Sequence, residues 1–309
     1  MLRLTDITIE NFRGIATAKL SGLADVTVLV GRNNCGKTTV LEAVARVVRS
    51  CDSNSHFDPA QRAREEWFDQ ARRQTSNDDL RFRGRVDRGW RLALTLGPKE
   101  WEISSRSAPG RMLDEDREHI EFFTRSTVFR PPHALVSIEV QLWQRLLKTR
   151  RDRDLVKAVR EIFGGDVEQL QVPGSQMFLL FPDYSVSIDV QGDGARAALR
   201  CLMVLITLGN GLLMLEEPEC HQHPGSLERF ARAVCQLAQQ QGTQLLLTTH
   251  SLECVRAFRD ASRDAGSSFA LMHLRRPEDG EVSVTRINGE DLDSLVDAGT
   301  DPRWLDLYG

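Results

Sequence analysis

The sequence lacks the features of a membrane, secreted or disordered protein. Its longest apolar stretch, 201–208, is too short to cross a bilayer, and the N-terminus has no apolar segment of the signal-peptide kind. The six cysteines are scattered along 309 residues and form no Cys-x-x-Cys pair, which argues against a zinc site or a disulfide framework. Apolar residues at 41% and charged residues at 27% are typical of a globular protein. We therefore expect a cytoplasmic protein without membrane contact.

The net charge of −4 is small for this length and is unevenly distributed. Residues 277–309 hold nine acids against two arginines, which leaves residues 1–276 with a slight positive excess. Such a balance provides no global attraction to nucleic acid, so any contact with DNA must use a local patch. The acidic C-terminal segment predicts either a solvated surface or a docking edge for a protein partner.

Predicted strands and helices alternate along the chain, which indicates an α/β fold with a mostly parallel central sheet. Continuous apolar runs are typical of strands buried on both faces, and they occur at 26–30, 212–215 and 244–248. Apolar residues at helical spacing predict helices over 38–48, 138–163, 195–208 and 227–241. Alternating apolar and polar residues predict strands over 4–10, 80–104 and 177–190, and a hairpin of 269–275 and 282–287.

The strongest motif is Gly31-Arg-Asn-Asn-Cys-Gly-Lys-Thr38, a full match to GxxxxGK[ST]. A predicted buried strand precedes it and a predicted helix follows it, as a phosphate-binding loop requires. Lys37 would neutralise the β- and γ-phosphates, and the Thr38 hydroxyl would bind the metal. The motif therefore predicts ATP and Mg²⁺ as cofactors. The residues expected to contact them are Gly31, Asn33, Asn34, Cys35, Gly36, Lys37, Thr38 and Thr39.

A second motif follows the apolar run 212–215, where Glu216, Glu217 and Glu219 surround a proline. A buried strand of a parallel sheet delivers such residues to its carboxyl end, the edge where ligands bind. Glu216 would lie near Mg²⁺, and Glu217 would polarise the attacking water.

A third motif, Thr248-Thr-His250-Ser, ends the apolar run that begins at Gln244. A neutral His250 at the same sheet edge could reach the γ-phosphate or the attacking water. Lys37, Glu217 and His250 are therefore the predicted catalytic residues, and Thr38 and Glu216 the predicted metal ligands.

In this order the three motifs resemble those of the ATP-binding-cassette (ABC) ATPases of the SMC/RecF/OLD class. The opening residues 7–14, ITIENFRG, look like that class's first strand and its turn. Residues 216–224 are similar to its EEPExHLHP Walker B motif and D-loop, with Glu216 in place of the usual aspartate, and residues 249–251 match its switch histidine. The segment 129–132 is similar to the Pro-Pro loop of its small members. The resemblance implies a P-loop NTPase fold of ABC-ATPase type: a mostly parallel sheet, an antiparallel β subdomain and a helical lobe.

The segment 191–196, QGDGAR, looks like a GDGxxR variant of the cassette signature. In the family the signature touches the γ-phosphate across a dimer, so Gly192, Gly194 and Arg196 are further expected nucleotide contacts. Asp193 would repel a phosphate, and we expect it to cap the following helix, with Arg196 or Arg200 facing the nucleotide. The Q-loop glutamine is either Gln141 or Gln144, or both are surface positions.

The resemblance implies one composite ATPase domain over 1–309. Its expected parts are a P-loop lobe, an insertion of antiparallel strands and helices, a part from the signature to the switch histidine, and an acidic end with a hairpin, at 1–50, 51–190, 191–276 and 277–309. We expect a helix in the polar segment 52–79 and a loop at 105–117. Residues 50–125 carry no motif of the class.

The implied function is an ATP-hydrolysing switch that acts as a homodimer or higher homo-oligomer. It would control DNA or a separate effector, a nuclease or other protein, in anti-phage defence or genome maintenance. The nuclease-bearing members of the class append a TOPRIM domain, for which the residues after His250 leave no room, and no coiled-coil heptads occur. DNA could bind residues 145–160, whose net charge is +5; their other interpretation is a solvated helix.

Two other functions remain open from the sequence. The first is a nucleotide-binding scaffold that does not hydrolyse ATP, which the irregular signature favours. The second is the nucleotide-binding subunit of a transporter, against which the missing Ser-Gly-Gly-Gln signature and the opening Asn11-Phe-Arg-Gly14 both count.

Overall fold

The computed structural model describes residues 2–50, 82, 89–106, 116–129, 136–174, 176–220 and 222–307. The insertion predicted at 52–79, most of the loop predicted at 105–117, and the Pro131-Pro132 segment lie outside these ranges. None of the helices in the described ranges is long and apolar enough to cross a bilayer.

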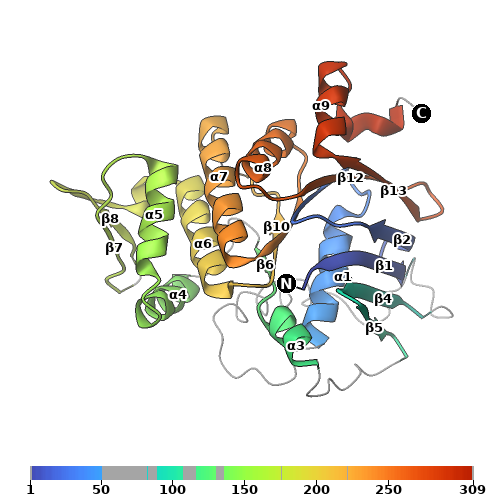
Figure 1. Ribbon diagram of the computed structural model, residues 1–309, viewed down its shortest axis with the longest axis horizontal. Coiled ribbons are helices and arrows are strands. Elements are labelled where there is room, and N and C mark those ends of the chain that lie inside the picture. Colours follow the sequence, from blue (N-terminus) through green and yellow to red (C-terminus); the bar gives the residue numbers. More distant parts are fainter. Residues whose placement is uncertain are drawn as a thin grey trace.

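A mixed sheet, ten-stranded within the described ranges, runs through the molecule in the order β5-β4-β1-β2-β13-β12-β3-β11-β10-β6 (Figure 1). The strands from β12 to β6 pair in parallel, whereas the β1–β2, β1–β4 and β4–β5 pairs are antiparallel. The strand bounds are β1 Leu4–Phe12, β2 Ile15–Ser21, β3 Val26–Val30, β4 Arg91–Leu96, β5 Lys99–Ser104, β6 Thr127–Phe129, β10 Leu212–Glu216, β11 Gln244–Thr248, β12 Phe269–Arg275 and β13 Glu281–Asn288.

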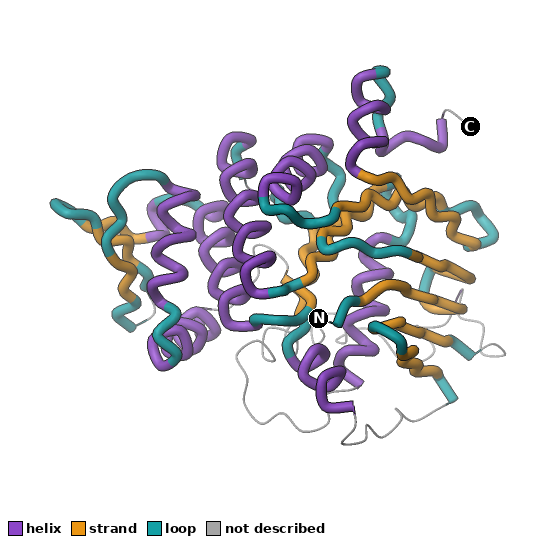
Figure 2. The backbone as a smooth tube through the Cα atoms, viewed as in Figure 1, coloured by secondary structure: helices purple, strands orange, loops and turns teal. Residues whose placement is uncertain are grey.

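Helices cover both faces of the parallel strands, and a lobe made mostly of helices extends from one side (Figure 2). A three-stranded sheet, β7 Gln169–Gln171, β8 Phe178–Leu180 and β9 Ser185–Ser187, borders that lobe. The helix bounds are α1 Lys37–Ser50, α3 Arg117–Thr124, α4 Val136–Lys148, α5 Asp152–Phe163, α6 Asp193–Leu208, α7 Pro224–Gln241, α8 Leu252–Asp264 and α9 Gly289–Asp297, with the 3₁₀ helices η3 Ile188–Val190 and η4 Pro302–Leu307.

Two hydrophobic cores lie on the two faces of the parallel strands. Alternate residues of a strand point to opposite faces, and β3 shows this directly: Val28 belongs to the core of the helical lobe, while Leu29 belongs to the core around α1. All residues of β3, β10 and β11 are buried. This burial on both faces is why these strands read as unbroken apolar runs in the sequence.

Two predictions about helices are wrong. The single helix predicted over 138–163 is two helices, because Arg150 has a φ of 55°, in the left-handed region where a helix cannot continue. The Arg151 guanidinium fixes the break by donating to the backbone oxygen of Ile206. Asp193 does not cap α6: Gly192 is the N-cap, without a side-chain hydrogen bond, and Asp193 is the first helical residue.

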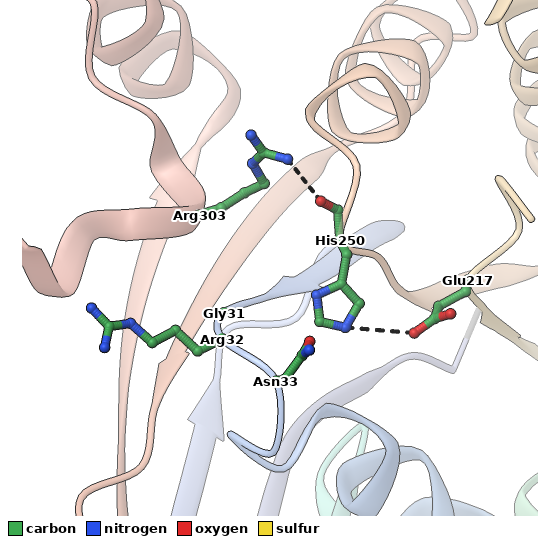
Figure 3. Close-up of a pocket in the computed structure, with 6 residues that line it drawn as sticks. All are labelled: Gly31, Arg32, Asn33, Glu217, His250 and Arg303. Atoms are coloured by element: carbon green, nitrogen blue, oxygen red, sulfur yellow. Dashed lines mark hydrogen bonds and ion pairs between the residues drawn. The ribbon is translucent and has the colours of Figure 1, made fainter.

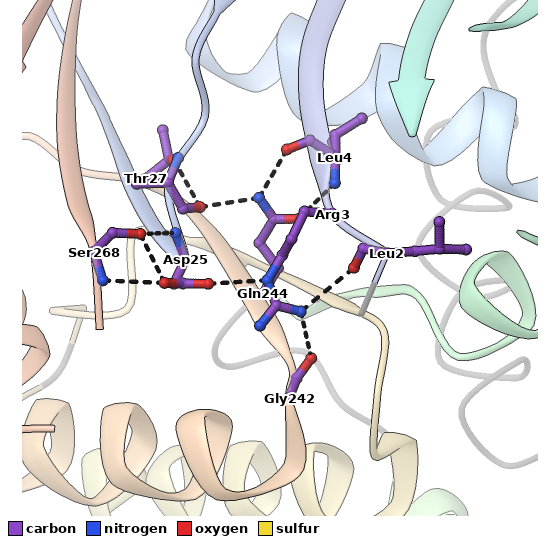
Figure 4. Close-up of polar contacts among 9 residues, drawn as sticks. Leu2, Arg3, Leu4, Asp25, Thr27, Gly242, Gln244 and Ser268 are labelled. Atoms are coloured by element: carbon purple, nitrogen blue, oxygen red, sulfur yellow. Dashed lines mark hydrogen bonds and ion pairs between the residues drawn. The ribbon is translucent and has the colours of Figure 1, made fainter. Parts of the chain in front are cut away.

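A buried amide joins the antiparallel strands to the parallel ones (Figure 4). Gln244, at the start of β11, donates to the backbone oxygens of Leu4 at 2.8 Å and Ala24 at 2.9 Å, and accepts from the Leu4 backbone N–H at 2.9 Å. Beside it, Arg3 donates to Asp25 and to the Gly242 carbonyl. These contacts set the position of β1 against the strands that carry the site described below.

Gln244→Leu is therefore expected to destabilise the protein strongly. It leaves the peptide groups of Leu4 and the carbonyl of Ala24 buried without their partners, at a cost of about 3 kcal/mol in unfolding free energy. Urea denaturation measures this, with Gln240→Leu, an exposed position on α7, as the matched control. An equal effect of the two substitutions would contradict the role assigned to Gln244.

Candidate nucleotide-binding site

The loop between β3 and α1 closes tightly because two positions require glycine. Gly31 and Gly36 have φ angles of 141° and 106°, which side chains rarely adopt. A Cβ on Gly31 would also lie 2.3 Å from the backbone oxygen of Leu274. Within the loop, Cys35 is buried while Asn33 and Asn34 are exposed, and Thr39 lies in the first turn of α1. The structure thus brings the whole predicted phosphate-binding segment into one turn at the N-terminus of a helix.

Lys37 folds back into the centre of this loop. Its Nζ donates to the carbonyls of Gly31 at 3.0 Å and Arg32 at 3.2 Å, and lies 3.8 Å from the Cys35 sulfur. Burial lowers the pKa of Lys37, opposed by the charges of Cys35, Glu217 and Glu219. The loop therefore holds a positive charge that carbonyl oxygens solvate only partly, and phosphate oxygens are stronger partners for it.

Thr38 and Glu216 meet across the site. The Thr38 hydroxyl donates to Glu216 Oε1 at 2.8 Å, and Glu216, the last residue of β10, is only 3% exposed. A hydroxyl and a carboxylate are the hard oxygen ligands that Mg²⁺ takes, usually one or two from the protein with phosphates and water completing the set. Thr38 and Glu216 therefore fit the predicted metal, and the two side chains already contact each other.

Glu217 adopts a left-handed backbone conformation, with φ of 46°. Such a conformation costs a non-glycine residue on the order of 1 kcal/mol and is common at functional sites. Its backbone N–H donates to the Thr248 carbonyl at 3.0 Å, which holds the turn after β10 against the end of β11. As a result the Glu217 carboxylate lies 3.5 Å from Nε2 of His250.

His250 lies between β11 and α8, and hydrogen bonds at this position and at the next residue hold its backbone. Its backbone N–H donates to Glu219 Oε1 at 3.2 Å, and the next residue, Ser251, caps α8 by accepting from the Cys254 N–H. Burial lowers the pKa of His250, and the charge of Lys37 adds to this, while Glu217 opposes it. The imidazole is therefore mostly neutral at pH 7. In this form one ring nitrogen donates a hydrogen bond and the other accepts one.

Glu217 and His250 line one pocket of about 850 Å³ together with the first residues of the phosphate-binding loop, whereas Lys37, Thr38 and Glu216 lie outside its lining (Figure 3). Its lining comes from four parts of the chain that are far apart in sequence: the phosphate-binding loop, the residues just after β10, those just after β11, and η4. The lining residues are Gly31, Arg32, Asn33, Glu217, His250 and Arg303. Of these, Arg32 and Arg303 were not among the residues predicted from the sequence. Arg32 occupies a variable position of the loop motif, and Arg303 lies outside every motif, so that only the packing of η4 brings it to the pocket.

The predicted signature segment does not line this pocket. Arg196 donates to both carboxylate oxygens of Glu139 at 2.9 and 3.0 Å, and it also pairs with Asp189. Arg200 pairs with the same Glu139, which is 1% exposed. Both guanidiniums are thus turned toward α4 within this chain, and a contact of Gly192, Gly194 or Arg196 with a nucleotide stays a prediction about a second subunit.

The predicted Q-loop candidates also lie away from the pocket lining. Gln141 and Gln144 are on α4, where Gln144 is exposed and Gln141 half-buried. Their surface interpretation therefore agrees with their positions in this chain.

Residues 2–80 and 144–255 match the family described as the AAA ATPase domain. This chain belongs to that family. The matched ranges include the phosphate-binding loop, Glu216, Glu217 and His250, whereas Arg303 lies beyond them.

Similar proteins of known sequence support the same class. An uncharacterized protein of Methanocaldococcus jannaschii is 32% identical over 94 residues, 30% of this chain and 81% of its own length. The OLD nuclease of Thermus scotoductus is 32% identical over 85 residues, which is 28% of this chain but only 15% of the nuclease. The chain thus matches a small part of that enzyme.

Solved structures show the fold. The Smc head domain of Pyrococcus furiosus, with an extended coiled coil and bound to the C-terminal domain of ScpA, has a TM-score of 0.61 at 10% identity and covers 96% of this chain and 99% of its own. The SMC head domain of Thermotoga maritima has a TM-score of 0.52 at 15% identity, with 93% and 99% covered. Together with the family match, these likenesses confirm both the ABC-ATPase type of fold and the SMC/RecF/OLD-like class predicted from the motifs.

The charges around His250 predict the direction in which its pKa responds to substitution. We expect the wild-type imidazole to titrate below pH 6.5. Glu217→Gln should lower the pKa further because it removes an anion, and Lys37→Met should raise it because it removes a cation. NMR titration of the histidine ring signals measures this, with His250→Gln identifying the signal. Shifts of the opposite sign would contradict the arrangement described.

Proposed function

We propose that this ATPase-domain protein is a switch that binds ATP with Mg²⁺, closes as a homodimer around two nucleotides and reopens after hydrolysis. The observation that carries the proposal is the meeting of Lys37, the Thr38–Glu216 pair and the Glu217–His250 pair at the carboxyl ends of β3, β10 and β11. A loop that served only as a turn would need none of these side chains.

Each of the chain's groups has a distinct task in this mechanism. Lys37 exchanges its loop carbonyls for the β- and γ-phosphate oxygens, and Thr38 and Glu216 hold the metal. The chemistry that Mg²⁺ would supply there, when bound, is neutralisation of the negative charge that develops on the phosphates. Glu217 orients the attacking water and accepts its proton, because its carboxylate is 41% exposed and faces the pocket. Neutral His250 hydrogen-bonds at the γ-phosphate side and holds Glu217 in place.

The dimer is proposed because Glu217 and His250, which line the pocket, are both partly exposed in a single chain. Residues 191–193, at the start of α6, are exposed, and the first N–H groups of a helix have no partners within it. Placed against the pocket of a second copy, these N–H groups would bind γ-phosphate oxygens and exclude water. ATP then favours the closed state through contacts that exist only there, which is the requirement for a nucleotide-driven switch.

The output of the switch is proposed to be control of a separate effector, a nuclease or another protein, in anti-phage defence or genome maintenance. The partial match to an OLD nuclease and the fold of SMC heads, one of them bound to part of ScpA, support this class of output. The non-hydrolysing scaffold remains the main alternative, and the transporter subunit is disfavoured by the family match.

A DNA-responsive form of the switch has an observation of its own. Lys148, Arg150, Arg153 and Lys157 surround the break between α4 and α5 and are all exposed. Because the break turns α5 away from α4, these four cations do not lie on one straight helix, contrary to the expectation from the sequence. They are suited to a phosphate backbone, whose affinity would fall steeply with salt.

Glu217→Gln is expected to reduce ATP turnover by about 10²–10⁴-fold, because the general base is lost while the shape is retained. Glu161→Gln, an exposed glutamate on α5, is the control and should be unaffected. Adding duplex DNA at two salt concentrations decides the output: stimulation that disappears at high salt supports the DNA-responsive form, and indifference supports a protein effector. A wild type that binds ATP but does not hydrolyse it would contradict the switch and support the non-hydrolysing scaffold.

The dimer has a separate test by mixing two inactive variants. Lys37→Ala disables the phosphate-binding loop, and Asp193→Trp blocks the signature from an exposed position in the first turn of α6. A mixed dimer contains one pocket with both parts intact, so we expect the mixture to recover turnover to about a quarter of wild type when the subunits exchange at random. Absence of recovery, with both variants folded, argues against a site shared between subunits.

A further inference from the structure

Arg303 reaches the nucleotide pocket from η4, far from every motif. Its guanidinium is held by Asp301: Nε lies 3.0 Å from Oδ1 and Nη2 lies 2.6 Å from Oδ2, in the two-pronged geometry that fixes an arginine best. The backbone N–H of Arg303 also donates to Asp301 Oδ1 at 2.9 Å. The side chain is therefore ordered by its own segment before it touches anything else.

The remaining nitrogen of Arg303 is directed at the switch histidine. Nη1 donates to the backbone oxygen of His250 at 2.8 Å (Figure 3). On the opposite side of the same residue, Glu219 Oε1 accepts from the His250 N–H at 3.2 Å and from the Thr249 hydroxyl at 2.5 Å. The backbone of His250 is thus held at both its N–H and its carbonyl, which fixes the Cα position from which the ring reaches Glu217.

We propose that Arg303 is a positioning residue: by holding the His250 carbonyl it keeps the imidazole facing Glu217, and so links the C-terminal segment 289–307 to the nucleotide site. This inference rests on the proposed function. Misplacement of a reacting or orienting group by about 1 Å can reduce a rate by about 10²-fold, so one hydrogen bond to this backbone is sufficient to matter.

The segment that carries Arg303 also includes a surface helix, α9. In the same segment, α9 packs on β12 and β13, and its acids Glu290, Asp291, Asp293 and Asp297 belong to the acidic segment noted in the sequence. A contact that shifts η4 would withdraw Arg303 from His250 and leave the ring unsupported.

Electrostatics agrees with the geometry. The charged groups that face His250 are Lys37 from α1, Glu217 and Glu219 from the turn after β10, and Arg303 from η4. Arg303 adds a positive charge that disfavours protonation of the ring, in the same direction as Lys37. It thus helps to keep His250 neutral as well as in place.

The test compares Arg303→Ala, Arg303→Lys and the control Arg286→Ala, which removes an exposed arginine that likewise donates to a backbone carbonyl, that of Gly22, at 2.9 Å. We expect Arg303→Ala to lower kcat by about 10–100-fold while KM for ATP changes by less than about threefold, and Arg303→Lys to recover part of the loss. Combined with His250→Ala, Arg303→Ala should add less than about twofold, because both act through one residue. Unchanged kcat, or losses that multiply in the double variant, would overturn the proposal.

A second measurement does not depend on turnover. Hydrogen–deuterium exchange of amides 248–254 should be about fivefold or more faster in Arg303→Ala than in wild type or Arg286→Ala, because one anchor of the loop is gone. Equal exchange in all three proteins overturns the role of Arg303. A wild type without ATP turnover, combined with this local increase, would instead reject the proposed hydrolysis and retain the link between η4 and the switch loop.

Discussion

The parallel pairing of β3, β11 and β10 is the constraint on which the rest of this structure depends. Three neighbouring strands buried on both faces place their carboxyl ends at one edge, so the residues that follow each strand are brought together without any direct attraction between them. The segments that follow these strands are the phosphate-binding loop after β3, the turn with Glu217 and Glu219 after β10, and His250 after β11. Gln244 fixes β1 to this unit, while Ile15 of β2 and Leu274 of β12 lie beside the glycines of the loop.

A small number of groups supplies the charge inside the site. Lys37 supplies the buried cation, and Glu216, Glu217 and Glu219 supply anions around it. Each glutamate has a different neighbour: Thr38 for the first, His250 for the second and the backbone of His250 for the third. Because a charge interacts strongly where water is scarce, the arrival of a nucleotide's phosphates and its metal would reorganise all of these contacts together. That coupling is the physical basis of the proposed switch.

The helical lobe holds the segment that would complete the site in a second copy. Glu139 of α4 pairs with Arg196 and Arg200 of α6; Glu139 and Arg200 are buried, whereas Arg196 is partly exposed. Removing one member of such a cluster leaves a buried charge unpaired, so α4 and α6 are obliged to move together. The orientation of the predicted signature is therefore set by a helix that follows β6, a neighbour of β10 in the sheet.

The sequence alone determined the motifs and the strands that carry them, because a phosphate-binding loop needs its glycines, lysine and threonine at fixed local spacing and a doubly buried strand needs a continuous apolar run. It did not determine the break at Arg150, since a left-handed residue in a polar stretch leaves the helical spacing on either side intact. It also did not determine the pairing of Arg196 with Glu139, or the contact of Arg303 with His250, which are 57 and 53 residues apart. Such contacts form only when helices and strands pack against one another. An arginine carries no local sequence signal that shows which carbonyl or carboxylate it will contact, so only the tertiary structure decides this.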